Sequence, residues 1–148
     1  MDRTTITFAV GNAIVARFPW LADNILNLLA YVSLRVRTPL QAKVDVERVA
    51  AIYPQLRTVN EALRVLQRLR HGGSCLSRSL SIAARFPDAQ VVIGVMPPAI
   101  RGRPSVGMRR RRVEAHAWVD VRGVILRDDS GSGWVELGRM DAAQTGGG

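Results

Sequence analysis

Thiol chemistry is the reaction type that the residue types of this chain suggest first. Cys75 is the only cysteine among 148 residues, and the two histidines are His71 and His116. A thiolate next to an imidazole can attack a peptide carbonyl, and the imidazole takes up a proton and later returns it to the leaving amine. A lone cysteine is more often a small buried hydrophobe. The residues around Cys75 must therefore decide between the two interpretations.

The segment around Cys75 favours the reactive interpretation. Gly72 and Gly73 precede it and allow a sharp turn and close approach of a substrate. Ser74 is a suitable N-cap residue, which predicts a helix with Cys75 in its first turn. The free N–H groups and the positive dipole end of such a helix stabilise a thiolate. The backbone N–H of Cys75 could also stabilise an oxyanion.

The residues around His116 predict the base and a carboxylate that orients it. His116 alternates with the Val/Ala positions of a strand and shares a face with Trp118, whereas His71 reads as a solvated helix end. A strict two-residue loop at Arg122-Gly123 places position 129 opposite His116, and a three-residue loop ending at Gly123 places position 128 there. Asp120 shares the face of His116 but lies nearer the turn. Spacing alone leaves Asp128 and Asp129 open as the third group.

Helical periodicity dominates the first seventy residues. An apolar stripe at spacings of three and four predicts an amphipathic helix that begins near Asp23 and ends before Pro39. Its members are Ile25, Leu28, Leu29, Val32 and Val36. Further helices are expected over about 46–53 and 59–70, and a helix that starts at Cys75 is expected to end before Pro87.

Strand patterns follow from residue 90 onward. Residues 91–96 form a buried-strand run, 113–121 alternate, and 124–126 and 134–137 predict two more short strands. Helices followed by a strand meander indicate an α+β fold. We expect one domain over residues 1–140, with a helical part at 1–71, a catalytic helix and small antiparallel sheet at 72–140, and a disordered tail at 141–148.

Charge and composition limit the class of partner. The net charge is +9 with a pI near 11.4, which attracts acidic peptides or polyanions. Aromatic residues make up 5%, and no zinc-ligand set, RNA-binding motif or phosphate loop is present, so we expect no nucleic acid, metal or cofactor. The run Arg109, Arg110, Arg111 and Arg112 is either a solvated loop or a clamp for an acidic peptide at the rim of the cleft.

Disulfide and membrane signals are both weak. A single cysteine cannot form an internal disulfide. The apolar runs at 4–16 and 25–34 are shorter than the roughly 20 residues that span a bilayer. We therefore expect a cytoplasmic protein that does not associate with membranes.

Three segments together resemble the B2 maturation proteases of lasso-peptide biosynthesis, which have transglutaminase-like chemistry. They are Cys-Leu-Ser-Arg-Ser-Leu at 75–80, Val-Ile-Gly-Val at 92–95 and Ala-His-Ala-Trp-Val-Asp-Val-Arg-Gly at 115–123. The resemblance covers about residues 74–129, and its Ala-His-Ala-Trp-Val core is the most specific part. Two features depart from the family pattern: the connection at 97–112 is longer and more basic, and Asp120 stands where Glu is common.

This resemblance implies a papain/transglutaminase-like fold and a triad of Cys75, His116 and Asp128, which favours the three-residue loop at Arg122-Gly123. It implies that the protein removes the leader from a ribosomally made precursor peptide. From their positions next to His116 and before its strand, Trp118 and the arginine run are candidate cleft residues. The implied partners are the precursor, a separate leader-binding protein and a macrolactam-forming cyclase. Two alternatives stay open: an amide crosslinker or acyltransferase that uses the same triad, and a non-catalytic basic module that binds acidic peptide or nucleic acid.

Overall fold

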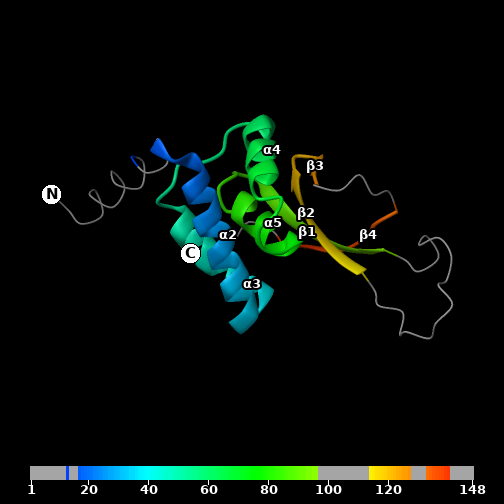
Figure 1. Ribbon diagram of the computed structural model, residues 1–148. Coiled ribbons are helices and arrows are strands. Elements are labelled where there is room, and N and C mark those ends of the chain that lie inside the picture. Colours follow the sequence, from blue (N-terminus) through cyan, green and yellow to red (C-terminus); the bar gives the residue numbers. More distant parts are fainter. Residues whose placement is uncertain (1–12, 14–16, 97–113, 128–132, 141–148) are drawn as a thin grey trace, which may run out of the picture.

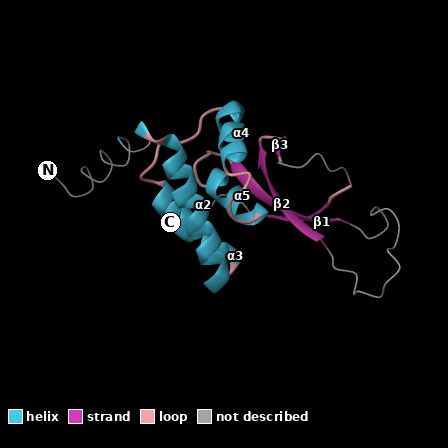
Figure 2. Cartoon of the chain, in the orientation of Figure 1, coloured by secondary structure: helices cyan, strands magenta, loops and turns pink. Residues whose placement is uncertain are grey.

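The computed structural model describes residue 13 and residues 17–96, 114–127 and 133–140. It confirms an α+β fold in which the described helices precede an antiparallel four-stranded sheet (Figures 1 and 2). The elements are α2 (Pro19–Val36), α3 (Pro39–Ala50), α4 (Val59–Arg68), α5 (Cys75–Ala83), β1 (Ala89–Met96), β2 (Glu114–Val121), β3 (Val124–Leu126) and β4 (Val135–Met140). None of the described helices combines the length and apolar character needed to cross a bilayer.

The sheet has the strand order β3-β2-β1-β4, with β2 and β1 in the middle. Alternate residues of β2 point to opposite faces, and the Val/Ala stripe predicted from the sequence lies on the helix-facing side. Ala117, Val119 and Val121 are buried there against α4 and α5. His116 and Trp118 take the other face, as the alternation predicts.

Local capping sets where three of the helices begin. The side chains of Thr38, Thr58 and Ser74 each accept a hydrogen bond from the backbone N–H three residues later. The side chain of that later residue in turn accepts a hydrogen bond from the backbone N–H of the cap residue. The N-cap prediction for Ser74 is confirmed. The predicted start of the second helix near residue 46 is wrong, because Pro39 begins α3 at a position where its missing N–H costs nothing.

The orientation of α2 corrects the prediction made from its periodicity. Four of the five apolar residues at spacings of three and four face solvent, with Leu28 63% and Val36 76% exposed, and the fifth, Leu29, packs partly buried against the core. The buried face instead consists of Leu26 together with smaller or polar residues: Ala22, Asp23, Asn27, Ala30 and Ser33. Asp23 therefore lies inside the helix and not at its start.

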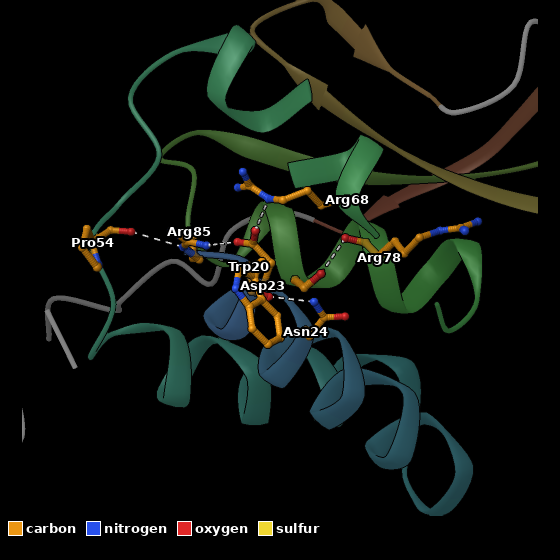
Figure 3. A network of polar contacts seen from close by, with 8 residues as sticks. Trp20, Asp23, Asn24, Pro54, Arg68, Arg78 and Arg85 are labelled. Carbon is orange, nitrogen blue, oxygen red and sulfur yellow. Dashed lines mark hydrogen bonds and ion pairs between the residues drawn. The ribbon is translucent and has the colours of Figure 1, made fainter. Parts of the chain in front are cut away.

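Asp23 is buried because it neutralises two arginines from other helices. Its carboxylate is 2.7 Å from Nε of Arg68 on α4 and 2.6 Å from Nη1 of Arg85, which follows α5 (Figure 3). Nε of Arg85 also donates to the carbonyl of Pro54 at 3.2 Å. This network links α2, α4 and the chain just after α5 in one fixed arrangement.

The hairpin between β2 and β3 has a two-residue loop. Val121 pairs with Val124, and both loop residues have positive φ, 53° for Arg122 and 86° for Gly123, as a type I′ turn requires. The three-residue loop favoured by the resemblance is therefore wrong. The exposed ion pair of Arg122 with Asp88 spans 2.9 Å.

Breaking the buried network should destabilise the fold far more than breaking a surface pair. Asp23→Asn should lower the free energy of unfolding by about 3–5 kcal/mol, because it leaves the Arg85 charge buried without a counter-charge. Asp45→Asn removes the exposed pair with Arg37 and should cost less than about 1 kcal/mol. Urea unfolding measures both, and similar small losses would contradict the assigned role of Asp23.

Candidate functional site

The sulfur of Cys75 is held at the start of α5 by a tight local structure. Ser74 caps the helix: its Oγ accepts from the backbone N–H of Ser77 at 3.1 Å, and its own N–H donates to Oγ of Ser77 at 2.9 Å. Gly73 turns the chain into this cap with φ of +67°. A Cβ on Gly73 would lie 2.4 Å from Oγ of Ser77. Only glycine fits this position, which confirms the sharp turn predicted before Cys75.

Asn27 on α2 supports the same turn and was missed from the sequence. Its side chain is 4% exposed, and its Oδ1 accepts the hydroxyl hydrogen of Ser77 at 2.8 Å. The same oxygen would be 2.9 Å from a Cβ on Gly73. The available signal was a pair of polar residues, Asp23 and Asn27, that lie four apart in a helix with many apolar residues.

Cys75 lies beside β2, near Ala117, which is outside the part of β2 that pairs with the described residues of β3. The described β3 pairs only with Val119, Asp120 and Val121. In a two-residue hairpin the residues that flank the loop bond to each other, so every second residue from Val121 directs its N–H toward β3. Ala117 is one of these residues, and its N–H lies near enough to the Cys75 sulfur to lower the pKa of the thiol. The thiol thus lies beside the backbone of β2 at Ala117.

The environment of Cys75 favours the thiolate. Burial by itself raises the pKa of the half-buried thiol, but the hydrogen bond with His116 opposes it. The N–H groups of Ala117 and Leu76 and the charge of protonated His116 act in the same direction as that bond. The pKa of Cys75 is therefore lowered below its ordinary value, as expected for a reactive cysteine.

Aromatic rings surround His116 on the open face of the sheet. The imidazole centroid is 5.0 Å from the Trp134 ring and 6.3 Å from the Trp118 ring. Gly94 pairs with His116 across β1 and β2, and a Cβ there would be 2.4 Å from the Trp118 ring and 2.8 Å from the Val135 carbonyl oxygen. Gly94 thus provides the space in which Trp118 packs beside the imidazole.

The third group of the predicted triad lies outside the described residues. This holds for Asp128 and Asp129 and for the arginine run 109–112. Asp120 is described, and it binds elsewhere: its carboxylate accepts from the Gly123 N–H at 2.7 Å and from Nη1 of Arg139 at 2.5 Å. His71 is exposed at the end of the α4 segment, as predicted.

Within the described ranges, no three His, Cys, Asp or Glu side chains gather closely enough to hold a metal ion. Comparison of the chain with protein-family models, curated proteins and solved structures finds no match. The chemistry of the site must therefore be argued from its own geometry, in which a capped helix start brings a thiol to an imidazole.

The lowered pKa of Cys75 predicts how its alkylation depends on pH. The iodoacetamide rate should reach half its plateau at a lower pH than for an ordinary cysteine thiol, because the thiolate persists to lower pH. His116→Gln should move this midpoint upward, since it removes both the bond and the charge that oppose burial. His71→Gln, which changes the other histidine, should leave the midpoint unchanged. Equal midpoints in all three proteins would contradict the pairing of Cys75 with His116.

Proposed function

We propose that this chain is a cysteine endopeptidase of papain/transglutaminase-like design that removes the leader peptide from a lasso-peptide precursor before the macrolactam forms. The observation that carries the proposal is the placement of the Cys75 thiol, at the start of α5, beside the His116 imidazole, which lowers the pKa of the thiol. The resemblance of residues 74–129 to lasso-peptide B2 proteases supports the substrate class. The net charge of +9 suits an acidic peptide.

The reaction follows from the positions of these groups. The Cys75 thiolate attacks the scissile carbonyl carbon, and the N–H of Cys75, at the first position of α5, stabilises the oxyanion. Protonated His116 donates its proton to the leaving amine, which departs as the core peptide and leaves a thioester on Cys75. Neutral His116 then takes a proton from water, the hydroxide adds to the thioester, and the leader leaves as a carboxylic acid.

We assign Asp128 as the carboxylate that orients His116, in accordance with the resemblance. A regular continuation of the β2–β3 register would place Asp129 opposite His116 instead, because Val121 pairs with Val124. The same ladder would also require the Ala117 N–H to bond to the backbone of residue 128. The ladder of the described residues runs to Leu126, and the choice of Asp128 over Asp129 rests on the resemblance.

The proposed setting is cytoplasmic, with three partners. These are the precursor, a separate leader-binding protein that presents it and a cyclase that joins the released N-terminal amine to an acidic side chain. A leader-binding protein is included because the described N-terminal residues form helices that pack into this domain's own core.

The experiment is cleavage of a synthetic precursor, encoded beside this chain's gene, with products identified by mass spectrometry. The parent should release a leader that ends in a free carboxylic acid, and Cys75→Ala should lower the rate more than about 10³-fold because it removes the nucleophile. Equal cleavage by Cys75→Ala would exclude the proposal. A leader joined to an added amine, with no free acid, would indicate the crosslinking alternative.

The same assay tests the assignment of the carboxylate. Asp128→Asn should slow cleavage by roughly 10²- to 10⁴-fold, because the amide cannot stabilise the imidazolium. Asp129→Asn is the matched control, with the same change one residue away, and should have much less effect. Thermal unfolding should show both variants folded. The opposite ranking would assign the role to Asp129.

A further inference from the structure

A hollow of about 240 Å³ lies between α4 and the end of β3, beside the candidate site. Its lining joins two leucines to three polar side chains: Leu63, Leu66, Gln67, Arg70 and Arg127. Small-molecule sites usually have volumes of about 300–1,000 Å³. The hollow therefore suits one or two side chains of a peptide better than a nucleotide or another cofactor.

Two chain connections place the hollow next to the reactive pair. Arg70 comes five residues before Cys75, and its carbonyl accepts a hydrogen bond from Nη1 of Arg78 on α5 at 2.7 Å. Arg127 lies over the Trp118 ring at 5.7 Å, and that ring lies 6.3 Å from the His116 imidazole. One wall of the hollow is thus bonded to α5, the helix that carries the nucleophile, and the other contacts Trp118, which lies beside the base.

The charge of the lining selects the ligand. Among the lining residues that the structure describes, two carry guanidinium groups and none carries a carboxylate. Arg70 is exposed, and within the described part of the chain it forms no ion pair, whereas Arg68 two residues earlier is bound to Asp23. A guanidinium beside an apolar wall suits a carboxylate on a short aliphatic stem. Leu63 and Leu66 provide that wall.

From these observations we infer that the hollow is a substrate subsite that takes an acidic side chain, glutamate or aspartate, of the peptide. Arg70 is the principal cation, and Gln67 can donate a further hydrogen bond from its amide. The inference rests on the proposed function, because it specifies the substrate class of that same site.

Affinity selection tests the subsite without depending on cleavage. A random library of N-acetylated, C-terminally amidated decapeptides is passed over immobilised Cys75→Ala protein, and the retained peptides are sequenced by mass spectrometry. Glutamate and aspartate should be enriched over glutamine and asparagine by roughly fivefold, the size expected of a partly exposed ion pair. Raising the salt to 0.5 M should reduce the enrichment.

Matched variants separate the subsite from the general charge of the protein. Arg70→Gln on the Cys75→Ala background should lose most of the enrichment. Arg48→Gln removes the same charge from the exposed side of α3, outside this hollow, and should keep it. Arg70→Glu should instead favour lysine and arginine. A second library, with free C-terminal carboxylates and no acidic residues, shows whether the site binds an acidic side chain or a C-terminal carboxylate. Retention of this second library alone would overturn the assignment.

The outcomes distinguish this inference from the proposed function. Equal enrichment by Arg70→Gln and Arg48→Gln, or no enrichment at all, overturns the subsite whether or not the parent cleaves precursor. Enrichment that depends on Arg70 supports the subsite even if the parent hydrolyses no peptide, a result that would count against the peptidase reaction alone.

Discussion

The site depends on one contact, in which the start of α5 meets β2. The Ala117 N–H, on the side of β2 that faces β3, lies near enough to the Cys75 sulfur to lower the pKa of the thiol. This places the thiol beside His116, whose ring lies on the sheet face turned away from the helices. The position of α5 against β2 is therefore as important to the site as the cysteine itself.

The helices hold this contact in place through buried polar groups. Asp23 joins α2 to Arg68 and Arg85, and Asn27, one turn later on the same face, bonds to Ser77 beneath the cap of α5. Charged and amide groups are costly to bury, so each requires its partner in a defined position. The polar face of α2 thus fixes the turn before Cys75 more tightly than apolar packing would. Precise placement of a nucleophile benefits from such support.

Local signals in the sequence predicted much of the fold and the pairing of Cys75 with His116. The Ser74 cap and the alternation around His116 depend on near neighbours, and both were confirmed. The buried face of α2 was not predictable in this way, because its larger apolar residues face solvent and Asp23 is buried only through arginines 45 and 62 residues away. The predicted length of the hairpin loop was also wrong, because arginine is an unusual residue at the positive φ that a type I′ turn requires of Arg122. Asp128 stays a prediction, because it lies outside the described residues.

The central claim, that Cys75 is a nucleophile activated by His116, is tested most directly by trapping the acyl-enzyme. Precursor and protein are mixed, quenched in acid within milliseconds to seconds, and analysed as intact protein and then as peptides. The account predicts an adduct with the mass of the leader acid minus water on the peptide that contains Cys75, and much less of it in His116→Gln. Rapid cleavage with no adduct at any quench time, together with undiminished cleavage by Cys75→Ala, would contradict the account.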